Sequence, residues 1–83
     1  MTAFERLINT GYHLDVFKWE NGIKTGIGIS FDHAEVKEGV FLAGIFGSGT
    51  TLEESCEDYI HKLSGKTLVF NTMSGDRKEV LVI

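Results

Sequence analysis

The sequence contains no proline, a single cysteine and no apolar run long enough to cross a membrane. One thiol, Cys56, cannot form an internal disulfide, so the chain carries no sign of folding in an oxidising compartment. A membrane helix needs about 20 apolar residues. The first residues, MTAFERLINTG, are charged where a signal peptide would be apolar. We therefore expect a cytoplasmic protein with no membrane partner.

Motifs that mark common enzyme chemistry are also missing. The chain has no GxxxxGK[ST] phosphate loop, no GxSxG elbow, no HExxH zinc motif and no CxxC pair. Its glycine-rich stretches, residues 26–28 and 44–49, do not match the strand-to-helix spacing of a dinucleotide-binding fingerprint. The sequence therefore predicts a protein that is not an enzyme and that uses no cofactor.

What the chain does contain is the composition of one small globular domain. Its 83 residues are 42% hydrophobic and 24% charged, which is ordinary for a folded domain. Two domains of half this length would each bury too little surface, so residues 1–83 are expected to form one domain. The net charge is −4, from 12 acidic and 8 basic residues. This charge argues against direct nucleic-acid binding, because a basic surface supplies most of that affinity.

The strongest local signal predicts a β-hairpin. Asn21-Gly22 favours a two-residue type I′ turn between two strands. That turn places three apolar pairs on one buried face: Tyr12 with Phe31, Leu14 with Ile29, and Val16 with Ile27. On the opposite face it sets Phe17 against Gly26, so that the ring can lie over bare backbone, and it adds Trp19 to the same face.

Helical periodicity predicts an amphipathic helix in the second half of the chain. Capping-box spacing at Thr50 or Thr51 marks its start, and Gly65 marks its end. Its apolar stripe consists of Leu52, Cys56, Tyr59, Ile60 and Leu63. A shorter helix is predicted between a capping box at Thr2 and a stop at Gly11.

The remaining segments predict three more strands. Residues 40–46 are apolar on both faces, which predicts a central strand covered on both sides. Residues 32–39 are predicted to be a charged connection with some strand character around Val36, and residues 67–72 and 79–83 a final hairpin. The expected order is α-β-β-β-α-β-β, an α+β fold with a mainly antiparallel sheet packed on one main helix.

An acidic helix face is the first candidate for a binding site. It consists of Glu53, Glu54, Glu57 and Asp58. Such a row of carboxylates can pair with the basic residues of a nucleic-acid channel. The alternative is a solvated face whose acids favour the helix dipole. The second candidate is the pair Phe17 and Trp19, because aromatic residues anchor interfaces, unless the first helix or the final hairpin buries them.

The opening of the main helix also carries a family resemblance. Gly49, Thr51 and Glu54 form a Gly-x-Thr-x-x-Glu pattern after the third predicted strand. Residues 12–63 thereby resemble the β-β-β-α domain of HicB-type antitoxins, which have a partial ribonuclease-H-like fold. The chain departs from that family in lacking the proline-containing segment before the helix and the DNA-binding extension.

In size and acidity the chain resembles small bacteriophage accessory proteins, including anti-CRISPR inhibitors. Together the two resemblances imply an inhibitor whose partner is a basic protein that handles nucleic acid.

Two other functions fit the sequence. A metal-stabilised or nucleotide-handling domain would draw ligands from His13, His33, His61 and Cys56 with acids near them. No local cluster supplies the four ligands that zinc prefers, so no metal site is predicted. A homodimeric structural module would pair through the apolar strand edge at residues 80–83.

Overall fold

The computed structural model describes residues 1–71 and 78–81. Within those ranges the chain forms two helices and seven strands: α1 (Ala3–Ile8), β1 (Leu14–Glu20), β2 (Thr25–Phe31), β3 (Ala34–Glu38), β4 (Phe41–Ala43), β5 (Gly47–Gly49), α2 (Leu52–Leu63), β6 (Thr67–Phe70) and β7 (Lys78–Leu81). The predicted α+β class is confirmed, and the order of elements matches with two added strands. No helix in the described ranges is long and apolar enough to span a membrane.

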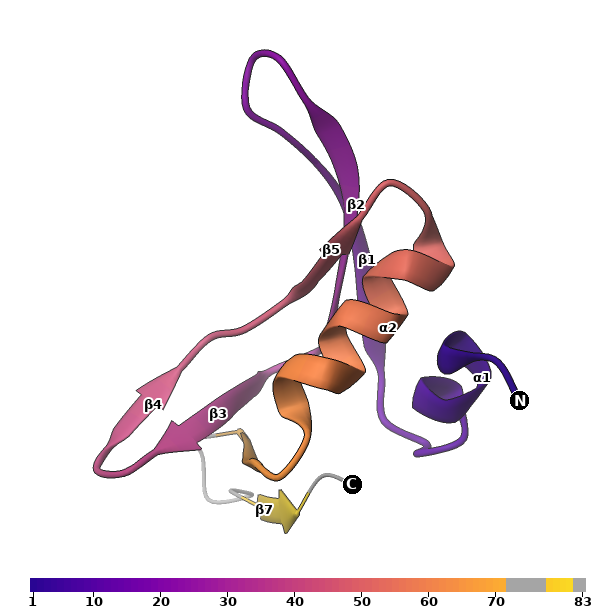
Figure 1. Ribbon diagram of the computed structural model, residues 1–83. Helices are drawn as coiled ribbons and strands as arrows, with labels where there is room; N and C mark the ends of the chain where they lie inside the picture. Colours follow the sequence, from indigo (N-terminus) through magenta and orange to yellow (C-terminus); the bar gives the residue numbers. More distant parts are fainter. Residues whose placement is uncertain (72–77, 82–83) are drawn as a thin grey trace.

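The strands form two antiparallel sheets. One has the order β1-β2-β5 and the other the order β4-β3-β6-β7. Helix α2 lies across one face of the three-stranded sheet, and α1 lies beside α2 (Figure 1). The β1–β2 hairpin projects from one end of the molecule and the β3–β4 hairpin from the other (Figure 1). The core therefore lies where α1, α2 and the inner faces of both sheets meet.

Both helices begin at the predicted caps. At α1 the Thr2 hydroxyl accepts a hydrogen bond from the Glu5 N–H (3.1 Å), and the Glu5 carboxylate accepts one from the Thr2 N–H (3.2 Å). At α2 the cap is Thr51, whose hydroxyl accepts from the Glu54 N–H (3.1 Å). The predicted stripe of α2 is also confirmed: Cys56, Tyr59 and Leu63 are buried, and Leu52 and Ile60 are half-buried.

The predicted hairpin is present, but its register is wrong by two residues. Val16 pairs with Ile29 and not with Ile27. The loop has four residues, closed by a hydrogen bond from the Asn21 N–H to the Lys24 carbonyl (3.0 Å) and by one from the Lys24 N–H to the Asn21 side chain (3.0 Å). Because the shift is an even number of residues, every side chain stays on its predicted face. Val16, which we expected to be buried, is 53% exposed.

In the observed register, each of two aromatic rings lies over a glycine of the neighbouring strand. Phe17 faces Gly28 and Trp19 faces Gly26, whereas the predicted register set Phe17 against Gly26. A Cβ atom at Gly28 would lie 2.3 Å from the Phe17 ring, and one at Gly26 would lie 2.4 Å from the Trp19 ring. Bare backbone therefore lets both rings rest on the sheet, as the sequence suggested for Phe17.

Residues 40–46 do not form the predicted central strand. Gly39 has a left-handed φ of 62° and turns the chain back, so that β4 pairs with the charged strand β3. This makes β4 an edge strand of its sheet. Val40 is 92% exposed and Phe41 is 75% exposed, which contradicts burial on both sides. The strand character expected around Val36 is confirmed: residues 34–38 of the predicted charged connection form the regular strand β3, with Val36 buried in the core.

The predicted final hairpin is confirmed in its strands. β6 pairs antiparallel with β7, and Leu68, Val69 and Phe70 are buried. Its connection, residues 72–77, lies outside the described residues, as do residues 82 and 83 of the predicted dimer edge.

The close approach of β5 to α2 yields a stability prediction. A Cβ atom at Gly47 would lie 2.1 Å from the Ser55 carbonyl oxygen and 2.4 Å from the Tyr59 Cβ. Since helix and strand would have to separate, we expect Gly47→Ala to lower the free energy of unfolding by about 3 kcal/mol. Gly44→Ala is the matched control, because nothing lies within 4 Å of that position. Urea denaturation measures both, and equal midpoints for the two variants would contradict the packing described.

Candidate functional site

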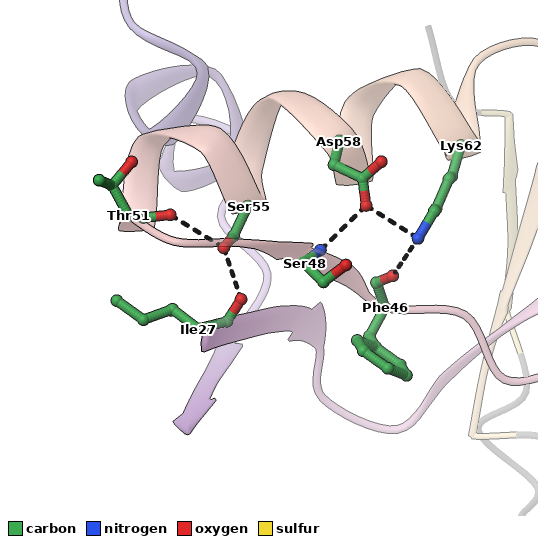
Figure 2. Close-up of polar contacts among 7 residues, drawn as sticks. All are labelled: Ile27, Phe46, Ser48, Thr51, Ser55, Asp58 and Lys62. Carbon is green, nitrogen blue, oxygen red and sulfur yellow. Dashed lines mark hydrogen bonds and ion pairs between the residues drawn. The ribbon is translucent and has the colours of Figure 1, made fainter. Parts of the chain in front are cut away.

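Three side chains of α2 bind the outer edge of β5 and the residue on either side of it. They stand one turn apart on the helix: Glu54, Asp58 and Lys62. The Glu54 carboxylate accepts from the Thr50 hydroxyl (3.0 Å) and N–H (3.4 Å). The Asp58 carboxylate accepts from the Ser48 N–H (2.9 Å), and the Lys62 ammonium donates to the Phe46 carbonyl (3.1 Å) (Figure 2). The helix thus satisfies main-chain groups that an edge strand normally leaves open.

Asp58 and Lys62 also form an ion pair of 2.8 Å (Figure 2). Partial burial acts to raise the pKa of Asp58. The hydrogen bonds from Lys62 and from the Ser48 N–H, with the positive charges of Lys62 and His61, outweigh burial and lower this pKa below its ordinary value of 3.8. Asp58 is therefore a structural carboxylate, held in its charged form by the edge of β5.

Ser55 joins the same helix to β2. Its hydroxyl is fully buried and lies 2.5 Å from the Ile27 carbonyl oxygen and 2.9 Å from the Thr51 carbonyl oxygen (Figure 2). Ser55 was not among the residues predicted from the sequence. One signal in the sequence could have indicated it: Gly47 and Gly49 alternate just before the helix. A strand face without side chains allows a helix to approach closely, so that a small polar residue of the helix can reach the neighbouring strand.

Glu53 joins the two helices. Its carboxylate accepts hydrogen bonds from the Ala3 N–H (2.8 Å) and the Phe4 N–H (3.2 Å), at the start of α1. These donors belong to the unsatisfied first turn of a helix, where a negative charge is favoured. Glu53 therefore holds α1 in place.

Glu57 is the one member of the predicted acidic face that makes no hydrogen bond or ion pair within residues 1–71 and 78–81. It is exposed and lines a shallow cleft between the two helices together with Arg6, His61 and Ser64. The structure thus divides the predicted face. Glu53, Glu54 and Asp58 bind other parts of the fold, and Glu57 points to solvent.

The aromatic candidates lie on the other side of the three-stranded sheet. Gly47 and Gly49 face α2, so Ser48 between them, paired with Gly28, belongs to the opposite face with Phe17. Phe17 packs edge-on against Phe46, with ring centroids 5.4 Å apart. We call Phe17, Trp19 and Phe46 the aromatic patch.

The aromatic patch is partly open to solvent. Phe17 is 38% exposed and Phe46 is 46% exposed, while Trp19 is half-buried. The Lys62 ammonium lies 5.8 Å from the centre of the Phe46 ring, a cation–π contact that joins the patch to α2. Within the described ranges the buried Trp19 Nε1–H has no hydrogen-bond partner.

Metal-ligand clusters are absent from the described residues, where no three His, Cys, Asp or Glu side chains come close enough to hold an ion. His33 lies 3.6 Å from Asp32 on an exposed turn. Cys56 is fully buried in the core. Burial, with the negative charges of Glu53 and Glu57, raises its pKa to about 11, so the thiol stays protonated and unreactive.

Comparisons with known proteins found no relative of this chain: no family model, no curated protein and no solved structure matches it.

The contacts of Asp58 yield a pH-dependent prediction. Asp58→Ala leaves Lys62 and the Ser48 N–H without a charged partner, so we expect it to lower the free energy of unfolding at neutral pH by about 1–2 kcal/mol. Because the folded-state pKa of Asp58 is lowered, its stabilisation is present above the ordinary value of 3.8 and is lost as pH falls through the folded-state value. The difference in the free energy of unfolding between wild type and Asp58→Ala should therefore become smaller at acidic pH.

Glu57→Ala is the matched control, because it removes a neighbouring carboxylate that binds nothing in the described fold. We expect a change within about 0.5 kcal/mol at any pH. Denaturant melts across the pH range measure both variants. If Asp58→Ala lowers the free energy of unfolding by the same amount at neutral and at strongly acidic pH, the charge of Asp58 does not stabilise the fold.

Proposed function

We propose that this protein is a non-enzymatic binding module that inhibits a basic, nucleic-acid-handling protein, in the manner of an antitoxin or an anti-CRISPR inhibitor of phage. The observation that carries the proposal is the aromatic patch, which leaves Phe17 and Phe46 partly exposed on a sheet face opposite α2. Exposed apolar surface of this kind marks interaction sites in small soluble domains.

The patch is suited to binding because its rings are already held in place. Phe17 rests on Gly28 and against Phe46, and Lys62 holds the Phe46 main chain and lies over its ring. Rings fixed before binding lose little conformational entropy when a partner covers them. Large aromatic side chains in such positions often contribute most of the binding energy of an interface.

A second apolar surface supports the same function. The tip of the β3–β4 hairpin carries Val40, Phe41 and Leu42, which are 92%, 75% and 37% exposed. This tip and the aromatic patch are linked along the chain by the segment that leads from β4 to β5 (Figure 1). Together they give the molecule two exposed apolar surfaces that a partner can cover.

The acidic residues support a basic partner in two ways. The net charge of −4 steers a positively charged protein towards the molecule over a distance. Glu57 alone among the four predicted acids is left for a direct ion pair with it. Glu53, Glu54 and Asp58 contribute to the field while they bind the fold, so reversing their charges would damage the protein as well as the interface.

The test uses substitutions that keep the main chain intact. Phe46→Ser removes a ring of the patch, while the carbonyl that binds Lys62 remains. Ile23→Ser, at a 96% exposed position in the β1–β2 loop, removes apolar surface elsewhere and serves as the matched control. The wild-type protein captures partners from cells of its source, and calorimetry then gives Kd for each variant. We expect Phe46→Ser to raise Kd at least about 10-fold, and Ile23→Ser to leave it unchanged.

The electrostatic and the inhibitory parts of the proposed function are tested by separate measurements. Glu57→Lys should slow association and weaken the salt dependence of binding. Saturating wild-type protein should displace nucleic acid from the captured partner in a gel-shift assay. Equal Kd values for Phe46→Ser and Ile23→Ser, or a saturated partner that still binds nucleic acid, would refute the proposal.

A further inference from the structure

The two outer edges of the three-stranded sheet are treated very differently. At one edge, side chains of α2 bind the main chain of β5 and of the residue on either side of it. At the opposite edge of the sheet lies β1, and no strand among residues 1–71 and 78–81 pairs with its outer side. β1 is seven residues long, and five of them are exposed: Asp15, Val16, Phe17, Lys18 and Glu20. Long open edges of this kind readily accept another strand.

The hydrogen bonds that flank the hairpin identify which main-chain groups face outwards. The His13 carbonyl accepts from the Asp32 N–H (2.8 Å), and the Asn21 N–H donates to the Lys24 carbonyl (3.0 Å). In an antiparallel ladder, hydrogen-bonded pairs alternate with pairs that are not bonded. The odd-numbered residues of β1 therefore bind β2 through their main chain. The main-chain N–H and C=O groups of the even-numbered residues point outwards and have no partner within residues 1–71 and 78–81: Leu14, Val16, Lys18 and Glu20.

We propose that a second copy of this chain pairs antiparallel along β1, about a twofold axis at Phe17. A twofold axis relating two antiparallel strands of one sheet stands perpendicular to the sheet, so residues on the same face meet. Phe17 is the middle residue of β1, and an axis there pairs the whole strand. Phe17 then meets Phe17 of the second copy, and Val16 meets Lys18 of the second copy.

The charges of β1 favour this register over its neighbours. With the axis at Phe17, Leu14 meets Glu20 and Asp15 meets Trp19, so no two like charges face each other. An axis at Lys18 would set two lysines in direct opposition. An axis at Val16 would leave Glu20 facing Tyr12, which lies beyond the end of the strand.

The apolar side chains at the axis would gain burial. Val16 is 53% exposed and Phe17 is 38% exposed in the single chain. Phe17 already binds β2 through its main chain, so in the new ladder it occupies a position without hydrogen bonds, where facing side chains approach most closely. Aromatic pairs at such positions stabilise antiparallel sheets.

The resulting dimer has one continuous six-stranded sheet, with α2 of both copies on one face and both aromatic patches on the other. This inference does not depend on the proposed function, because the second copy is itself the partner. Each copy carries a net charge of −4, so repulsion opposes pairing and added salt should strengthen the dimer.

The test changes the charges of two residues that the proposed register pairs across the dimer, Val16 and Lys18. Val16→Lys would set the introduced lysine against Lys18 of the second copy, and we expect it to raise the dimer dissociation constant at least about 10-fold. Val16→Lys combined with Lys18→Glu would place opposite charges in both of these pairs and should restore dimerisation. Ile23→Lys adds the same charge in the exposed loop, away from the axis, and should change little. Sedimentation equilibrium over a range of concentrations measures all four proteins, and a thermal melt confirms that each is folded.

Hydrogen exchange of the unmodified protein gives a second measurement that needs no variant. The Val16 and Lys18 amides should become more protected as protein concentration rises, whereas the Phe17 amide, bound to β2, should be protected at every concentration. A wild-type protein that stays monomeric at all concentrations would overturn the proposal. So would a Val16→Lys variant that dimerises as wild type does, or a double variant that stays monomeric while folded.

Discussion

The contact between α2 and β5 is the interaction on which the rest of the structure depends. β5 contributes a strand with glycine at both ends, and the helix approaches until a Cβ atom at Gly47 would overlap its backbone. At this distance Asp58 reaches the outer main chain of the strand, and Glu54 and Lys62 reach the main chain of the residues that flank it, Thr50 and Phe46. The helix takes the place of a neighbouring strand, so that the sheet is closed on one side by side chains.

This arrangement explains why an acidic helix face is no simple docking surface. A helix of 12 residues offers few positions, and here three of its four acidic residues are divided between two tasks inside the fold. Glu53 holds α1, while Glu54 and Asp58 hold the segment that contains β5. The same contacts place Phe46 next to Phe17, because Lys62 fixes the main chain at Phe46. Lys62, paired with Asp58, therefore organises the aromatic patch, while the acids themselves do not belong to it.

Local signals in the sequence predicted the parts of the fold that local physics decides. The cap at Thr51, the apolar stripe around Tyr59 and the faces of the β1–β2 hairpin depend on residues close together in the chain. The hairpin register was wrong because the loop has four residues, closed by hydrogen bonds between Asn21 and Lys24, where a two-residue turn was predicted. The four-residue loop brings Trp19 to Gly26, whereas the two-residue turn would have set it against Lys24.

The site was harder to predict because its contacts connect distant parts of the chain. Glu53 binds the N–H groups of Ala3 and Phe4, and no spacing rule links residues so far apart. The apolar run at residues 40–46 suggested burial, and the turn at Gly39 instead placed it on an edge. What the sequence did predict correctly is that Phe17 and Trp19 share one face of the hairpin, with a glycine beneath the Phe17 ring.

The hydrogen bond by which α2 holds the outer edge of β5 can be detected in solution. The most direct measurement is the scalar coupling across the hydrogen bond from the Ser48 amide nitrogen to the side-chain carboxyl carbon of Asp58, detected by NMR on isotope-labelled protein. We expect a measurable coupling and a Ser48 amide that exchanges slowly with solvent. No coupling, together with exchange as fast as that of an exposed loop amide, would contradict it.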